Sequence, residues 1–201
     1  YFEYAHHLQW FDYLRSDHFG LWEDNGKIVG IACYEMNMGT CHLHTSEPYE
    51  FLLPELLSWA ERELSVDKDN KYKLQVWITD KEENKQELLA SHGYFLSHSE
   101  PVKTFNYTKP FVYRVLPEGF TIIDGTDIDY AKLSECFWRG FDHDEIPPAE
   151  NIDGNIKCWN APRASLKLMT IAVSPNGEYA CALGMWFDSQ NKYAYLEPLA
   201  T

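Results

Sequence analysis

The end of the chain constrains its fold more than any other stretch. Residues 168–201 contain three apolar runs, at 168–173, 179–187 and 193–200, separated by Ser174-Pro175-Asn176-Gly177 and by Asp188-Ser189-Gln190-Asn191. Short β-rich runs divided by turn-forming residues are typical of an antiparallel meander. We therefore expect three consecutive antiparallel strands. The last run holds one carboxylate, Glu197, and reaches the final residue of the printed sequence, Thr201.

Composition indicates a globular protein with a sizeable core. The 201 residues are 45% apolar and 15% aromatic, and the net charge is −14. An acidic chain argues against nucleic acid or an anionic membrane as a partner, and no apolar run is long enough to span a bilayer. The five cysteines include no CxxC pair, which favours reduced thiols in a cytoplasmic protein. Both ends of the sequence resemble interior segments, so we expect a chain truncated at both ends.

The first half of the chain predicts alternating helices and strands. Asn25-Gly26 favours a two-residue hairpin turn, Asp80 is a good helix N-cap, and Gly93 is a helix stop. We expect helices over residues 1–15, 50–64 and 81–91, and strands over residues 21–24, 27–35, 40–45, 71–79, 94–96 and 102–107.

We expect the second half to repeat this plan. Two prolines, Pro110 and Pro117, bracket a short run, and after them we expect a strand over 120–123, a helix over 127–141, an acidic loop over 142–155 and the meander. Two copies of one layout explain the length well. The expected organisation is a first domain over 1–109, a linker over 110–116, and a second, incomplete domain over 117–201.

Five segments carry a resemblance to a known superfamily: LWEDNGKIVGIACYE (21–35), LQVWITD (74–80), NKQELLASHGYF (84–95), LPEGFTI (116–122) and YLEPLAT (195–201). Together they resemble GCN5-related N-acetyltransferases, and most closely tandem-domain enzymes of the mycothiol-synthase-like type. The resemblance implies an α+β fold of two such domains. Each would hold a mixed, mostly antiparallel sheet flanked by helices.

The resemblance also implies acetyl-CoA as co-substrate. In the superfamily a Gly-rich loop after the fourth strand opens a helix, whose backbone N–H groups hold the pyrophosphate. The matching stretch of the first copy, 44–53, has no glycine and contains Glu47 and Glu50, so we expect that copy to be degenerate. In the second copy the loop and the general acid would lie beyond Thr201. The backbone of Leu199, Ala200 and Thr201 would meet the pantetheine arm. The 201-residue chain alone is expected to bind acetyl-CoA weakly or not at all.

Candidate catalytic and acceptor-binding residues follow from the same resemblance. Glu197 would be the base that takes a proton from the acceptor amine, and the alternative is a carboxylate bonded to a neighbouring backbone group or to substrate. The loop residues Asp142, Asp144 and Glu145 would hold a cationic amine, or would simply be solvated. Five aromatic residues would line an acceptor cavity or fill the core: Phe137, Trp138, Phe141, Trp159 and Trp186.

Two functions remain open on the sequence alone. The first is an acetyl-CoA-dependent N-acetyltransferase, with its active site in the second domain and a small-molecule or peptide amine as acceptor, by preference a cationic one. The second is a non-catalytic binding or regulatory module on the same fold. No metal centre is expected, because His42 and His44 share a strand face with no further ligand spaced nearby. The sequence does not fix the oligomeric state.

Overall fold

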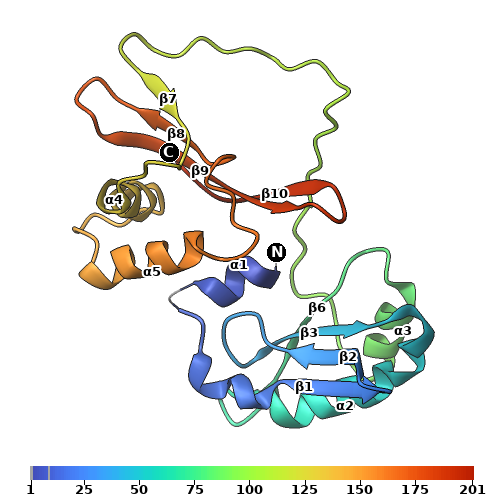
Figure 1. Cartoon of the computed structure of the whole chain (residues 1–201). Coiled ribbons are helices and arrows are strands. Elements are labelled where there is room, and N and C mark those ends of the chain that lie inside the picture. Colours follow the sequence, from blue (N-terminus) through green and yellow to red (C-terminus); the bar gives the residue numbers. More distant parts are fainter. Residues whose placement is uncertain (1, 9) are drawn as a thin grey trace. The chain divides into compact units, whose positions relative to one another are not determined.

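The structure is a computed structural model that describes residues 2–8 and 10–201. Its contacts divide the chain into two compact units (Figure 1). The 12–111 unit is Asp12–Phe111, and the 112–201 unit is Val112–Thr201 together with the described residues up to Phe11. The short helix α1 (Phe2–His7) therefore groups with the second unit, whereas the sequence had placed it in a domain over 1–109.

A tight hairpin begins the sheet of the 12–111 unit, as predicted. Strands β1 (Gly20–Asp24) and β2 (Lys27–Cys33) pair antiparallel, with Asp24 opposite Lys27. The two residues between them, Asn25 and Gly26, have φ values of 50° and 75°. Positive φ at both central positions is the type I′ turn that an Asn-Gly pair favours. Strand β3 (Thr40–Thr45) follows with the predicted bounds.

The 12–111 sheet is mixed and is covered by helix α2 (Leu53–Glu63). Its strand order is β1-β2-β3-β6, and β6 (Gln75–Trp77) runs parallel to β3. The α2 helix buries Leu56, Leu57 and Ala60 completely. The remaining elements are the 3₁₀ helices Tyr13–His18 and Glu47–Leu52, the small pair β4 (Val66–Asp67) and β5 (Tyr72–Lys73), and helix α3 (Glu83–Ser91).

Several element boundaries in this half of the chain differ from the prediction. The helix expected over 1–15, of which Tyr1 and Gln9 lie outside the described residues, is divided because Asp12 Oδ1 accepts from the Leu14 N–H at 3.1 Å and starts a 3₁₀ turn. The strand expected over 71–79 is split between β5 and β6. Helix α3 begins at Glu83, because the Glu82 carboxylate bonds to the Thr79 N–H at 2.7 Å and Asp80 is not its cap.

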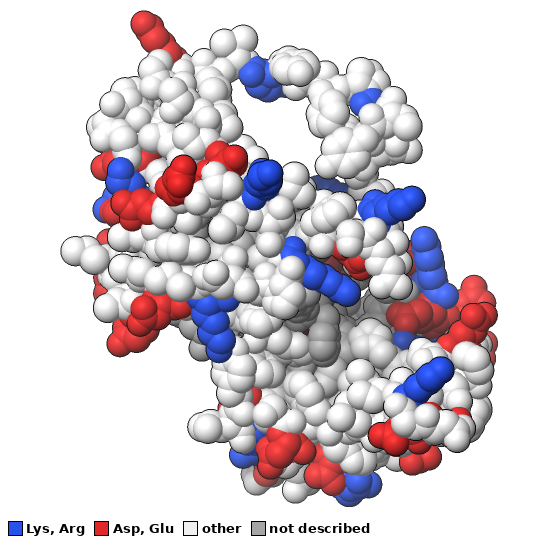
Figure 2. Space-filling view, in the orientation of Figure 1, with Lys and Arg blue, Asp and Glu red and all other residues white. Residues whose placement is uncertain are grey.

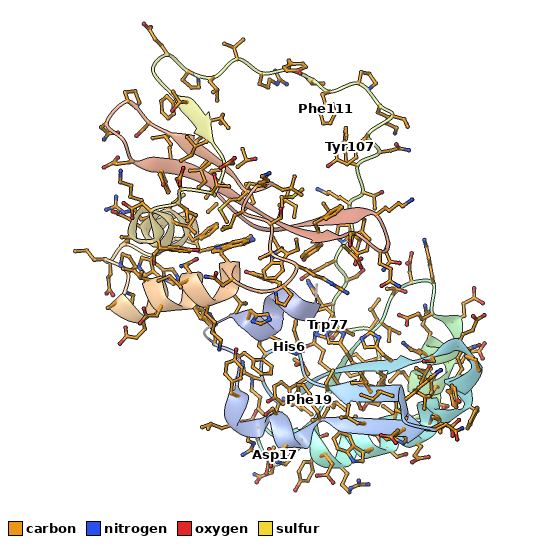
Figure 3. The ribbon with its side chains drawn as sticks, viewed as in Figure 1. His6, Asp17, Phe19, Trp77, Tyr107 and Phe111 are labelled. Carbon is orange, nitrogen blue, oxygen red and sulfur yellow. The ribbon has the colours of Figure 1, made fainter. Side chains whose placement is uncertain are left out.

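The predicted strands at 94–96 and 102–107 do not form. Phe95 is 85% exposed and Val102 is 88% exposed, and a β segment without a partner edge leaves its backbone to water. The segment instead turns at Asn106, whose carbonyl accepts from the Lys109 N–H at 3.0 Å. Tyr107 and Phe111 point toward one another across this turn, with ring centroids 5.9 Å apart (Figure 3).

The 112–201 unit contains the predicted meander. Strands β8 (Thr170–Val173), β9 (Tyr179–Asp188) and β10 (Tyr193–Ala200) are consecutive and antiparallel, and β7 (Thr121–Ile123) pairs with β8. The strand order is β10-β9-β8-β7, so β10 is an outer strand. Asp188 closes the last turn by accepting from the N–H groups of Gln190 and Asn191 at 2.9 and 3.1 Å.

Two helices cover one face of this sheet (Figure 1). Helix α4 (Tyr130–Gly140) starts at Asp129, whose side chain accepts from the Ala131 N–H at 2.9 Å. Helix α5 (Ala149–Trp159) corrects the prediction of a loop over 142–155. It begins directly after Pro148, and proline is well tolerated at a helix start. The helical spacing of Ile152, Ile156 and Trp159 was missed because acidic and polar residues separate them.

Charge is distributed over both units. On the face shown in Figure 2, acidic and basic side chains are interspersed, and no broad basic area is present there. Within residues 2–8 and 10–201, no helix combines the length and the apolar character needed to cross a membrane.

Gly184 on β9 is tightly packed in the 112–201 unit. A Cβ atom on this residue would lie 2.0 Å from Cη2 of Trp159 and 2.6 Å from the Glu197 carbonyl oxygen. Side chains essentially never approach so closely, so only glycine leaves room for the indole between α5 and the sheet. The position of Trp159, and with it the end of α5, therefore depends on this glycine.

Gly184→Ala should destabilise the protein by roughly 1–3 kcal/mol, because an added methyl group overpacks a full core. Thermal unfolding followed by near-UV circular dichroism would measure the loss. Ser189→Ala, at an exposed position in the neighbouring turn, is the control and should leave the melting temperature nearly unchanged. Equal melting temperatures for Gly184→Ala and the unmodified protein would contradict the packing described.

Candidate functional site

Strand β10 carries an irregularity at Glu197 and Pro198. Its register against β9 shifts there, because Leu196 pairs with Met185 and Leu199 with Leu183, so two residues oppose the single residue Gly184. This count is that of a β-bulge, which re-aims side chains and recurs beside functional sites. The Glu197 carbonyl accepts from Trp186 Nε1 at 2.9 Å, which fixes the bulge to β9.

A cavity of about 320 Å³ lies beside this bulge. Residues from helices α1, α4 and α5, from the segments that follow α1 and α4, and from β10 form its wall. The lining residues are Tyr4, Leu8, Trp10, Ser134, Phe137, Trp138, Phe141, His143, Asn151, Gly154, Asn155, Cys158, Trp159 and Pro198. The volume falls within the range of small-molecule sites.

Stacked rings give the cavity flat, apolar walls. Phe137 and Trp159 lie at 22° to each other with centroids 6.3 Å apart, and Trp138 stacks on His143 at 18° and 3.9 Å. Burial raises the pKa of the Cys158 thiol to about 12, so this residue is neutral at physiological pH. The wall therefore suits a planar, largely apolar ligand.

The predicted catalytic and cofactor residues lie on or directly after the bulge. Glu197 is partly buried, and the Tyr195 hydroxyl donates to its Oε2 at 3.2 Å. The next residue, Pro198, belongs to the cavity wall. Leu199 is 49% exposed, Ala200 is buried and Thr201 is exposed. Ala200 is buried because Gly140, the last residue of α4, lets the helix approach it: a Cβ there would lie 2.5 Å from that of Ala200.

The predicted acidic acceptor residues do not line the cavity. Asp142, Asp144 and Glu145 are exposed, whereas His143 between them is part of the wall. Of the aromatic candidates, four line the cavity, and Trp186 instead lies in the core, 5.7 Å from the Trp159 ring.

Sequence reasoning missed the contribution of α5 and α1. Asn151 and Asn155 stand one helical turn apart on α5, and Tyr4 belongs to α1, which contacts α5. The spacing of Asn151, Asn155 and Cys158 was a usable signal for one helix face. No local pattern indicated that α1 packs here, because that contact joins residues more than a hundred positions apart.

The 12–111 unit has a separate, polar cavity of about 420 Å³ at the end of β3. Pairing of β3 with β6 stops at His42, and the next carbonyl, that of Leu43, accepts from Lys85 Nζ at 2.7 Å. Lys85 also donates to the Glu82 carboxylate. Glu50, Glu82 and Glu83 line this cavity. Burial opposes ionisation of Glu82, but hydrogen bonds from Lys85 and from the Thr79 N–H outweigh it and lower its pKa.

His44 of the same cavity is held neutral. Burial lowers its pKa, and the Lys85 charge lowers it further, while Glu82 acts in the opposite direction. Within the described part of the chain, no group of three or more metal-ligating side chains gathers here or elsewhere. This end of β3 is therefore occupied by an internal lysine–glutamate pair and is flanked by carboxylates.

Comparison with known proteins supports the fold. No family model matches this chain, and no curated protein matches it. It is similar to the crystal structure of a GCN5-related N-acetyltransferase from Sphaerobacter thermophilus, with a TM-score of 0.52 and 16% sequence identity over 88% of this chain. The chain spans 58% of the length of that protein. It has an α+β fold of this acetyltransferase type, with a mixed and an antiparallel sheet flanked by helices.

Proposed function

We propose that the protein is an acetyl-CoA-dependent N-acetyltransferase of the tandem-domain type, and that the 112–201 unit carries its active site. The bulge of β10 is the observation that supports this most. It combines, within five residues, a carboxylate at Glu197, a cavity wall at Pro198 and the outer edge of a sheet at Leu199–Thr201. The fold likeness supports the same reaction class.

The end of β10 suits the amide-bearing arm of acetyl-CoA. Among the described residues, β10 pairs only with β9, so its second edge has no partner strand within them. An extended chain of amides can add to such an edge through main-chain hydrogen bonds. We assign this contact to Leu199, Ala200 and Thr201. Acetyl-CoA supplies the thioester, and backbone N–H groups of the strand polarise its carbonyl.

Glu197 is the proposed general base. It takes a proton from the acceptor nitrogen, directly or through one water, as the nitrogen attacks the thioester carbonyl and the thiolate departs. The hydrogen bond from Tyr195 orients its carboxylate. Pro198, the residue next to this base in the chain, lines the cavity in which the acceptor would be held. The exposed carboxylates of Asp142, Asp144 and Glu145 would attract a cationic amine as it approaches the site.

The 12–111 unit is proposed to be a degenerate copy that does not bind acetyl-CoA. Lys85 already uses the Leu43 carbonyl, at the point where β3 and β6 stop pairing. Glu50, Glu82 and Glu83 place negative charge where a pyrophosphate would need positive charge or N–H donors. This acidic cavity also favours the second candidate, a non-catalytic binding module, for this unit.

Glu197→Gln should lower kcat of the complete gene product by about 10²–10⁴-fold and leave KM for acetyl-CoA nearly unchanged, because it removes the base and keeps the shape. CoA thiol release would be measured with a panel of aryl amines, alkyl amines and peptide α-amines. Glu178→Gln, the same change at an exposed residue directly before β9, is the control. Full activity of Glu197→Gln would show that Glu197 is not the general base. An unmodified protein without acetyltransferase activity would favour the non-catalytic binding module.

Lys85→Met should destabilise the protein by roughly 1.5–3 kcal/mol at pH 7, because it leaves the Leu43 carbonyl and the Glu82 carboxylate without their charged donor. The Glu82 contribution is present above the ordinary glutamate pKa of 4.5 and is lost as the pH falls through its lowered value. The deficit in urea denaturation should therefore shrink at pH 3. Lys81→Met, exposed in the same cavity wall, is the control, and an equal loss there would refute a specific role for Lys85.

A further inference from the structure

Three hydrogen-bond donors around the 112–201 cavity have no partner. They are Ser134 Oγ, Trp138 Nε1 and Trp159 Nε1, and each atom is closed off from solvent. All three residues belong to the cavity wall. Ser134 is 1% exposed and Trp159 is 3% exposed, so neither can reach bulk water instead. Three residues of one cavity wall thus each carry a donor that the protein itself does not satisfy.

Unsatisfied buried donors are uncommon because each one costs free energy. More than nine in ten buried polar groups in native proteins have a partner, and an exception calls for an explanation. An indole N–H can only donate, and a hydroxyl can donate as well as accept. A ligand that offers two or more acceptor oxygens could therefore be recognised by this wall. Small side-chain adjustments of the kind that accompany ligand binding would bring the donors to it.

The wall also offers no carboxylate, lysine or arginine to a charged ligand. None of its residues is Asp, Glu, Lys or Arg, and the Cys158 thiol is neutral. An ion transferred into such surroundings loses its hydration without gaining an opposite charge. The acidic residues Asp142 and Asp144 beside His143 are exposed and do not compensate.

We propose that the cavity binds an uncharged, planar aromatic compound that carries a carbonyl group, and that the acceptor of the transfer is an aryl amine of this kind. The stacked Phe137–Trp159 and Trp138–His143 pairs would contact its ring, and the serine and indole donors would bind its oxygen. An aryl amine is neutral at pH 7, since its lone pair is shared with the ring. The identity of the acceptor rests on the proposed acetyl transfer, whereas binding to the cavity does not.

Ligand-detected NMR titrations of the 201-residue protein, without acetyl-CoA, test the binding. Benzamide offers a carbonyl, toluene offers only the ring, and benzylammonium offers a charge. We expect benzamide to bind at least tenfold more tightly than either of the others. Equal affinity for toluene would show that the donors are not used. Tighter binding of benzylammonium would show that the aromatic walls select a cation through their faces. Either result overturns the proposal.

Ser134→Ala separates recognition from folding. This substitution should weaken the binding of benzamide about five- to tenfold and leave the affinity for toluene unchanged. The melting temperature of the ligand-free protein should stay equal or rise, because an unpaired buried hydroxyl is removed. Ser91→Ala, whose hydroxyl already bonds to the Leu88 carbonyl at 2.7 Å, is the matched helical control. Trp138→Phe, which removes an N–H and keeps a ring, should give a similar selective loss.

Unchanged benzamide affinity in both variants, or an equal loss for benzamide and toluene, would refute the role of the donors. The two proposals can fail separately. A protein that binds benzamide but transfers no acetyl group to 4-aminobenzamide would refute the transfer and retain the cavity. A protein that acetylates only alkyl or peptide amines and does not bind benzamide would retain the transfer and refute the aromatic acceptor.

Discussion

The contact between Gly184 and Trp159 is the constraint on which the 112–201 unit depends. Because Gly184 has no side chain, the Trp159 indole fits against it. The two residues of β10 opposite Gly184, Glu197 and Pro198, form the bulge. Trp186 then bonds to the Glu197 carbonyl and holds the bulge in register. One glycine thus couples the last turn of α5 to the strand on which the proposed chemistry lies.

That coupling explains why a cavity, a carboxylate and a sheet edge occur together. Pro198 of the bulge belongs to the cavity wall, Glu197 precedes it in the chain, and the strand continues to Ala200. In the 12–111 unit, β3 pairs without such a shift and its end is occupied by Lys85. The two units share a general α+β plan but differ at the strand end where acetyl-CoA would bind.

Local turn chemistry made much of the fold predictable. Asn25-Gly26 specified one hairpin, and Asp188 with the residues after it specified another. The strands expected at 94–107 failed because a strand needs a partner edge, which a local pattern does not reveal. The candidate site was partly predictable, since four of the aromatic residues proposed from the sequence line the cavity, whereas the role of Glu197 stays a prediction. The wall of the cavity was not predictable. Helix α5 lies in an acidic stretch that was interpreted as a loop, and α1 contacts α5 although the two are far apart in the sequence.

Hydrogen–deuterium exchange of the complete gene product, with and without acetyl-CoA, tests the central claim most directly. An amide that gains a hydrogen-bond partner exchanges more slowly, so each strand reports on its own edge. The account predicts new protection at residues 197–201 of the β10 segment and none at residues 42–45 of β3. Protection at 42–45 with none at 197–201 would contradict it, because the 12–111 unit would then be the one that binds acetyl-CoA.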